Sequence, residues 1–486
     1  MRLFEPLSIG AMTLENRIVL PAMVTRLAGE DGTVNDDVRA RYLRFAKGRP
    51  GLIVLEAMSV HGGKSGPLLR LSSDEFIPDQ ADLVRRMRDV SPSKVVPQII
   101  HFLKIARSGW RQKVSDLTRE EIRTIVHQYA AAAGRARRCG YDGVELHMAH
   151  AYTVSSFLSR LNQRPDEYGR SLENRMRLMT EILLAVRAEV GRDFPVGVRY
   201  DGEECIKNGY TLSDSKTIAL RMAELGADWI SVSAGGKFED AVAKPGVPLY
   251  PYTGYSGDRC MPPASYPDGA NAYLAEGIKA HLVARGFATS VVVSGKIRSP
   301  ELAESILQAG RADLIGMARA LLADPDWAVK VASGRADHLI RCVYGNVCKN
   351  LDENFRKVVC YLWPKGALQA PVSDDRSVPE WEGEGRLRAW DSVGRVHLRW
   401  DEARDEEAIY GYEIYRADGG GPFEHVNSVK GTTYVDRDVV GGRPYRYFVR
   451  AYDLAGNRSA RSSVEEIRLA SAKETWPEAK PLQGGP

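Results

Sequence analysis

Short apolar runs alternate with amphipathic stretches over most of the first 320 residues. The runs are rich in β-branched residues and nearly continuous in apolar character, which is typical of parallel strands covered on both faces. They occupy residues 18–23, 52–60, 95–101, 143–149, 195–201, 229–235, 290–295 and 314–319. Helical patterns lie between them, and the one over 119–139 is followed by Gly140 as a C-terminal cap. Eight strands with alternating helices predict an α/β fold, the (β/α)8 TIM barrel. An open doubly wound sheet fits less well, because no GxGxxG motif follows the first run.

The pattern changes after residue 365. Residues 366–384 are polar and rich in Pro and Gly, as expected of a linker. From 385 to 470, short alternating stretches between turn residues predict a small all-β sandwich. It resembles a fibronectin type III domain, with Trp400 as the core tryptophan and Tyr445 as the tyrosine-corner residue. We therefore expect a barrel over 1–365, including a cysteine-containing segment at 338–365, then the linker, the sandwich and a disordered tail at 471–486.

The composition narrows the class of protein. The 67 basic and 63 acidic side chains leave a formal net charge of +4, too small a surplus to indicate nucleic acid or an acidic membrane as partner. No apolar run is long enough to span a bilayer, and the N-terminus lacks a secretory pattern. We therefore expect a cytoplasmic protein that acts on a small molecule. A homo-oligomer and a protein partner bound through the sandwich remain open.

Polar side chains stand at or just beyond the carboxyl ends of the predicted strands, the rim that carries chemistry in TIM barrels. His147 and His150 follow the fourth strand. Two imidazoles there can donate N–H bonds to one carbonyl oxygen and so polarise a conjugated C=C bond. The phenol of Tyr152 is a suitable acid for protonating a developing enolate carbon. Two other interpretations stay open: the histidines pack a strand end and bond to backbone, or they chelate zinc.

Five segments of the chain resemble, in their order along the sequence, segments of the old yellow enzyme family of NADH:flavin oxidoreductases. They are FEPLSIGAMTLENRIVLPAM (4–23), GYDGVELHMAHAY (140–152), RPDEYGRSLENRMR (164–177), VGVRYDGEE (196–204) and GRADLIGMARALLADPDW (310–327). The resemblance covers residues 1 to about 340 and implies an enzyme that binds FMN and takes electrons from NAD(P)H. It implies reduction of a C=C bond conjugated to a carbonyl, nitro or thioester group. In the family, the positions of His147 and His150 hold the substrate oxygen, and that of Tyr152 donates the proton.

The resemblance also implies the cofactor contacts. Gln98 can pair in both directions with the amide-like edge of a flavin, and Arg199 can place positive charge near flavin N1 and O2. Gly295 lets the backbone approach a phosphate that Arg319 can bind with two hydrogen bonds, at the usual barrel phosphate site. The other expected contacts are Ala22, Met23, Val24, Ala57 and Ala318. Taken singly, Arg199 could instead form a strand-end salt bridge with Glu203, and Gly295 could be a plain turn.

Two segments depart from the family pattern. Many relatives have a cysteine or threonine after the PM of the first strand, which bonds flavin O4, whereas here Val24 occupies that place. Thr25 follows and should point to the other face. The family's HxGR after the third strand reads HFLK at 101–104. These departures concern substrate preference and redox potential rather than FMN binding.

Cys342, Cys348 and Cys360 resemble the iron–sulfur motif of larger relatives such as trimethylamine dehydrogenase and 2,4-dienoyl-CoA reductase. Gly345 stands in place of the second cysteine of CxxCxxC, and a four-iron cluster normally needs four thiolates. We therefore predict that the cluster is absent and that no metal is bound. A zinc site completed by His338, or a three-iron cluster, stays open.

Two alternatives to the ene-reductase function also stay open. One is an FMN-dependent dehydrogenase or demethylase resembling trimethylamine dehydrogenase. The other is a barrel without activity that presents the sandwich as a binding module.

Overall fold

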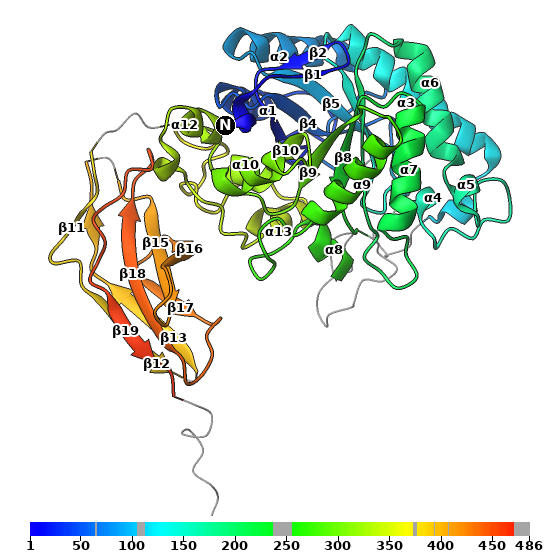
Figure 1. The fold of residues 1–486 in the computed structure, drawn as a ribbon. Coiled ribbons are helices and arrows are strands. Elements are labelled where there is room, and N and C mark those ends of the chain that lie inside the picture. The colour runs from blue at the N-terminus through cyan, green and yellow to red at the C-terminus, as the bar shows by residue number, and fades with distance from the viewer. Residues whose placement is uncertain are drawn as a thin grey trace, which may run out of the picture. The chain divides into compact units, whose positions relative to one another are not determined.

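The chain forms two compact units in the computed structural model, which describes residues 1–63, 66–104, 112–236, 255–372, 377–392, 394–406 and 408–470 (Figure 1). Unit 1 comprises Met1–Ala336, Tyr344–Cys360 and Leu368–Ala370. Unit 2 comprises Asp337–Val343, Tyr361–Ala367 and the chain from Pro371 onward. The sequence pattern predicts a single boundary near residue 365, whereas the compact units interleave between residues 337 and 371.

Unit 1 is a closed barrel of eight parallel strands, as the apolar runs predict. The strands are β3 (Ile18–Leu20), β4 (Leu52–Ser59), β5 (Lys94–Ile100), β6 (Val144–Met148), β7 (Val196–Asp201), β8 (Trp229–Ser233), β9 (Ser290–Ser294) and β10 (Leu314–Gly316). They pair in chain order, and β10 closes on β3. Every residue of β4, β6, β7 and β8 is buried. Helices outside and side chains inside cover both faces of these strands, so the fold class is confirmed.

Helices surround the barrel in Figure 1. The α-helices are α1 (Asp36–Lys47), α2 (Ile77–Val90), α3 (Arg119–Arg138), α4 (Thr153–Leu158), α5 (Leu172–Arg175), α6 (Arg177–Val190), α7 (Leu212–Glu224), α8 (Tyr255–Cys260), α9 (Ala272–Ala284), α10 (Pro300–Gln308), α11 (Ala318–Ala323), α12 (Trp327–Ala332) and α13 (Val347–Glu353). Single 3-10 turns lie at η1 (Arg2–Phe4), η2 (Asp74–Phe76), η3 (Val114–Asp116) and η4 (Ala336–His338). Within the described ranges, no helix is both long and apolar enough to cross a membrane.

Local sequence signals explain where the helices begin and end. Thr118 and Glu121 form a capping box at the start of α3, and Gly140, with a φ of 82°, follows its last turn. Asn35 caps α1 by accepting a hydrogen bond from the backbone N–H of Val38.

A hairpin of β1 (Leu7–Ile9) and β2 (Met12–Leu14) packs against one end of the barrel interior. Ile9, Met12 and Leu14 form one buried cluster with residues at or near the strand starts, among them Leu52 and Trp229. The amino-terminal end of the barrel is therefore filled with apolar side chains, which leaves the carboxyl end for polar ones.

Unit 2 is an antiparallel β-sandwich, as predicted. One sheet consists of β12 (Leu387–Ser392), β13 (Arg395–Trp400) and β17 (Thr433–Asp436), and the other has the order β16 (Glu424–Val429), β15 (Gly411–Asp418), β18 (Pro444–Tyr452), β19 (Glu465–Arg468). A short pair, β11 (Glu380–Trp381) and β14 (Ala403–Arg404), is added. Trp400 and Tyr445 lie in the core between the sheets, and the Tyr445 hydroxyl accepts a hydrogen bond from the backbone N–H of Val440 (2.8 Å). The tyrosine corner is thus confirmed.

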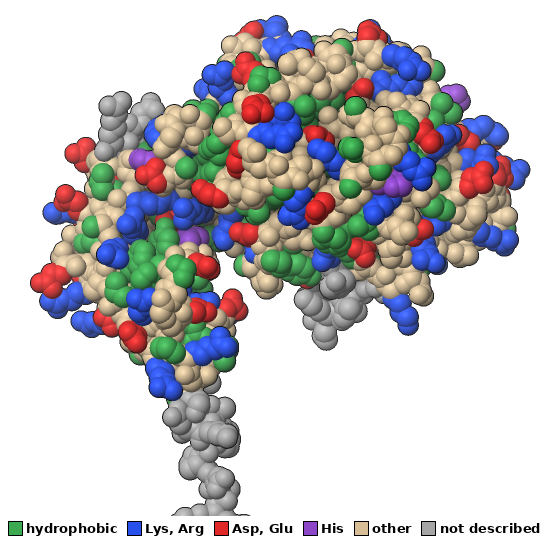
Figure 2. Space-filling model, in the orientation of Figure 1, with side chains coloured by type: hydrophobic (Ala, Val, Ile, Leu, Met, Phe, Trp, Pro, Cys, Tyr) green, Lys and Arg blue, Asp and Glu red, His purple; other side chains and the backbone are tan. Residues whose placement is uncertain are grey.

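Charged side chains of both signs are interspersed over the visible face of unit 1 in Figure 2. This mixture agrees with the formal net charge of +4.

Candidate active site

A cavity opens at the carboxyl ends of the barrel strands in unit 1. Its volume is about 1120 Å³, including space open to solvent. All twelve catalytic and cofactor-binding residues expected from the sequence line it: Ala22, Met23, Val24, Ala57, Gln98, His147, His150, Tyr152, Arg199, Gly295, Ala318 and Arg319. Seven of the eight barrel strands thus contribute to one site, and the individual roles of these residues stay predictions.

His147 and Tyr152 form an aromatic cluster with His150. The ring centroid of His147 lies 5.1 Å from that of Tyr152 and 5.2 Å from that of His150. Nδ1 of His147 accepts a hydrogen bond from the backbone N–H of Ala149 (3.2 Å), so the proton of the neutral imidazole sits on Nε2. Burial, and then the charge of Arg199, lowers the pKa of His147 to about 3. At neutral pH this imidazole is therefore an uncharged N–H donor.

His150 is held in an unusual backbone conformation. Its φ is 59° and that of Ala151 is 62°, a left-handed region that costs free energy for residues other than glycine. Asp201 Oδ2 accepts hydrogen bonds from the backbone N–H of His150 (2.8 Å) and from the Ser155 hydroxyl (3.2 Å). Ser155 in turn accepts from the N–H of Ala151 (3.2 Å). These bonds stabilise the turn that presents His150 and Tyr152 to the cavity.

The side chain of His150 also lies in a buried polar network. Its Nε2 is 2.6 Å from the hydroxyl of Ser233 on the neighbouring β8. Burial, then the neighbouring His147 and Arg199, lowers the pKa of His150 well below its ordinary value. Both histidines are therefore uncharged at neutral pH, and a neutral imidazole keeps one N–H that can donate to a carbonyl oxygen.

Asp201 is a buried acid whose second carboxyl oxygen, Oδ1, lies 3.8 Å from Nε2 of His150, beyond hydrogen-bond distance. Its side chain is 2% exposed, and Oδ1 accepts no hydrogen bond from any described residue. Burial raises the pKa of this carboxyl to about 8, because the charged form loses its hydration.

We expect Asp201→Asn to stabilise the protein by an amount that grows with pH. The unfolded carboxyl loses its proton near its ordinary pKa of 3.8, and the folded carboxyl near 8. The wild-type protein therefore loses stability as pH rises through this window, whereas the amide does not titrate. Urea unfolding midpoints between pH 4 and 9 should show a gap that opens above pH 4 and levels off above pH 8. The exposed Glu120→Gln serves as control, and a gap of constant size would show that Asp201 titrates normally.

Gln98 and Arg199 present hydrogen-bonding groups to the cavity from β5 and β7. Gln98 Nε2 donates to Glu145 Oε1 (2.7 Å), and Trp229 donates to the other oxygen of Glu145 (3.0 Å). Gln98 keeps its carbonyl oxygen and a second N–H for a ligand. Arg199 donates to the hydroxyls of Ser231 (2.9 Å) and Ser233 (3.4 Å) on β8. The alternative salt bridge from Arg199 to Glu203 is not formed within 4.0 Å.

A second polar corner follows β9 and β10. The hydroxyl of Ser294 is buried there and has no hydrogen-bond partner among the described residues. Gly295 has a φ of 133°, and a Cβ at this position would lie 3.0 Å from the side chain of Asn271. Arg319 lies with its guanidinium 4.5 Å from the ring centroid of Tyr344. A hydroxyl without a hydrogen-bond partner, a backbone without a Cβ and an arginine are a set of groups that suits a phosphate.

Comparison with known proteins agrees with this geometry. The sequence profile of the NADH:flavin oxidoreductase / NADH oxidase family matches residues 2–113, 80–245 and 263–338. The chain belongs to this family. It is 34% identical over 351 residues to an NADPH dehydrogenase of Geobacillus sp. The match covers 68% of this chain and 93% of that protein.

Two longer members of the family are also similar. An NADH oxidase of Thermoanaerobacter brockii is 33% identical over 405 residues, which are 78% of this chain and 58% of that protein. An N,N-dimethylglycine/sarcosine dehydrogenase of Chromohalobacter salexigens is 31% identical over 382 residues, 74% of this chain and 52% of that protein. The chain thus spans little more than half the length of these relatives. Membership places the chain in a family of oxidoreductases that use flavin and NAD(P)H.

The cavity fits the flavin that this NADH:flavin oxidoreductase family uses. The donor and acceptor groups of Gln98 match the pyrimidine edge of a flavin, and Arg199 lies among the same lining residues. The orphaned hydroxyl of Ser294, together with Gly295 and Arg319, matches a phosphate. The departures from the family pattern leave this set intact. Thr25, next to Val24, donates its hydroxyl proton to Glu56 (2.7 Å) and does not line the cavity.

Sequence reasoning missed one wall of the cavity. It consists of Cys260 and Met261 at the end of α8, with Tyr344, Cys348, Lys349, Asp352 and Val358 around α13. Burial raises the pKa of the Cys260 thiol to about 12, so it stays protonated. The segment from about 236 to 270 follows β8 and is rich in Gly, Pro and Tyr, a composition and size that predict a loop over the active site. Its residues 237–254 lie outside the described residues.

The described parts of the chain hold no group of three or more His, Cys, Asp or Glu side chains that could bind a metal ion. The absence of an iron–sulfur cluster, and of the zinc site with His338, nevertheless stays a prediction that metal analysis must test.

Proposed function

We propose that the protein is an FMN-dependent ene-reductase that uses NAD(P)H to reduce a C=C bond conjugated to a carbonyl, nitro or thioester group. One observation carries the proposal: two uncharged histidines and the phenol of Tyr152 line the same cavity as a donor set that fits FMN. The family membership supports the same reaction class.

Three side chains and the flavin have separate roles in the proposed reaction. When bound, FMN supplies the transfer of hydride from NAD(P)H to the β-carbon of the substrate. His147 Nε2–H and His150 donate hydrogen bonds to the substrate oxygen, which gains negative charge as hydride arrives. Tyr152 donates its hydroxyl proton to the α-carbon, which completes the addition of hydride and proton across the double bond. The tyrosinate then recovers a proton from solvent.

The charges around the cavity favour this substrate over an amine. The lining contains four basic side chains, those of Arg199, Lys296, Arg319 and Lys349, and one acid, Asp352. Asp352 forms an ion pair with Arg26 (2.8 Å), and burial raises its pKa. An ammonium ion entering the cavity would find no unpaired carboxylate among these described lining residues, whereas a carbonyl or carboxylate would find donors.

The alternative, an amine dehydrogenase or demethylase, is favoured by the similarity to the dimethylglycine/sarcosine dehydrogenase. A direct comparison of ligands separates the two. Under argon, the oxidised protein should show no bleaching of the flavin bands with sarcosine, dimethylglycine or trimethylamine. A phenol such as 4-hydroxybenzaldehyde, which mimics an enolate oxygen, should produce a long-wavelength charge-transfer band.

His147→Ala should weaken phenol binding by roughly 10- to 100-fold, the usual effect of losing a hydrogen bond to a charged group. His127→Ala, exposed on α3, should not change it. Bleaching by an amine without a phenol band would favour the dehydrogenase.

A further inference from the structure

Most of the cavity wall that the sequence did not predict is formed by residues 344–360, hereafter called the wall. Residues 344–360 belong to unit 1, and Tyr344, Lys349 and Val358 are among their cavity-lining residues. The chain reaches this segment from 337–343 and leaves it through 361–367, and both of these flanking segments belong to unit 2. The wall is therefore joined at each end to the unit that contains the sandwich.

Inside unit 1, residues 344–360 contact Arg319, which lies at the polar corner after β9 and β10. Arg319 Nη1 donates to Asn346 Oδ1 (2.5 Å), and the guanidinium lies over the ring of Tyr344. Farther along, the backbone N–H of Val358 donates to Thr25 (2.8 Å), and Asp352 pairs with Arg26. A displacement of the segment would therefore move two partners of Arg319.

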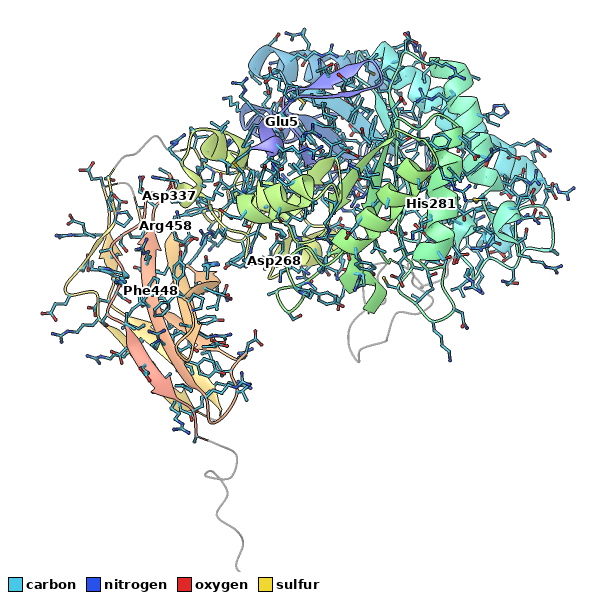
Figure 3. The ribbon with its side chains drawn as sticks, in the orientation of Figure 1. Glu5, Asp268, His281, Asp337, Phe448 and Arg458 are labelled. Carbon is cyan, nitrogen blue, oxygen red and sulfur yellow. The ribbon has the colours of Figure 1, made fainter. Side chains whose placement is uncertain are left out.

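Inside unit 2, the segment before the wall is fixed by Arg458. This guanidinium forms a buried ion pair with Glu413 (2.7 Å) and donates to the backbone carbonyls of Leu339 (2.7 Å) and Asp337. Figure 3 labels Asp337 and Arg458 close together in unit 2. Gly456 has a φ of 88°, and a Cβ there would lie 2.0 Å from the carbonyl oxygen of His338. Only glycine allows the backbone of residue 456 to pack this closely against the carbonyl of His338, so the sandwich can contact the segment 337–343 directly.

The segment after the wall is fixed in the same unit by two more bonds to backbone carbonyls. The hydroxyl of Tyr361 donates to Ser428, on β16. Lys430, just beyond β16, donates to the carbonyl of Trp363. Both ends of the wall are thus held by the sandwich, which lowers the number of conformations open to residues 344–360.

We infer that the sandwich is a clamp for the active-site wall: by holding segments 337–343 and 361–367, it fixes Tyr344 and Asn346 and through them Arg319. The module is then a positioning element of the flavin site. The clamp itself does not depend on the proposed function, but its effect on flavin rests on the role proposed there for Arg319.

Lys430→Met and Tyr361→Phe test the clamp, each by removing one bond to a backbone carbonyl. Amide hydrogen exchange is measured on the flavin-free full chain, and FMN affinity by fluorescence titration. We expect exchange in 344–360 to be at least several-fold faster, with β15 and β18 unchanged. We expect the FMN dissociation constant to rise roughly 5- to 10-fold, as the loss of one hydrogen bond allows. Lys365→Met, which changes an exposed lysine in the same segment, is the matched control.

The outcomes separate the two ideas. Unchanged exchange in 344–360, in a variant whose β15 and β18 stay protected, would overturn the clamp. Faster exchange with unchanged FMN affinity would uphold the clamp and remove Arg319 from the proposed phosphate site.

Discussion

Tyr152→Phe should slow the reaction with the alkene by roughly 10²- to 10⁴-fold, the usual effect of losing a general acid. Flavin binding and bleaching by NADPH should stay as in the wild type, because neither uses the hydroxyl. The phenylalanine ring can keep the edge-on packing against His147, whose ring centroid is 5.1 Å away. The effect should therefore fall on proton donation alone. Stopped-flow traces of the two half-reactions, recorded separately under argon, measure it.

Tyr273→Phe is the control for this experiment. Its phenol is partly exposed, donates to Glu203 (2.8 Å) and does not line the cavity. A Tyr152→Phe protein that reduces the alkene at the wild-type rate would remove Tyr152 from the mechanism.

Arg319→Ala should lose its flavin on dialysis while the barrel stays folded. The change removes the guanidinium proposed to bind the phosphate and also the partner of Tyr344 and Asn346. Loss of a ligand that binds only the folded state should also lower the thermal midpoint, and added FMN should restore part of it. The flavin absorbance retained per chain after dialysis gives the result.

Arg298→Ala is a matched comparison for Arg319. Arg298 also lies near the ring of Tyr344, at 5.7 Å from its centroid, but it does not line the cavity. Equal flavin retention in the two variants would place the phosphate elsewhere.

The barrel and the main site residues could be predicted because their signals are local. Each apolar run gave a strand, and the runs ended within a few residues of the observed ends. Residues such as His147 and Arg199 stand at strand ends, and a barrel gathers the carboxyl ends of its strands at one rim. Tyr445 was predictable for the same reason, since the tyrosine corner lies within a few residues of chain.

The wall around α13 could not be predicted in this way. Its cysteines indicate a metal motif, whereas it is Tyr344 and Asn346 that contact Arg319. Those contacts join residues that are far apart in sequence, and the spacing of apolar and polar residues does not predict them. No local pattern in the sequence marks Arg458, whose side chain is only 8% exposed and binds a segment more than a hundred residues earlier. The interleaving of the two units follows from such tertiary contacts.

Anaerobic stopped-flow spectroscopy of the purified protein tests the central claim most directly. NADPH should bleach the flavin bands, and 2-cyclohexenone should then restore them while one equivalent of cyclohexanone forms. A colourless protein that takes up no FMN, or a bleached flavin that 2-cyclohexenone and other activated alkenes cannot reoxidise, would contradict the account.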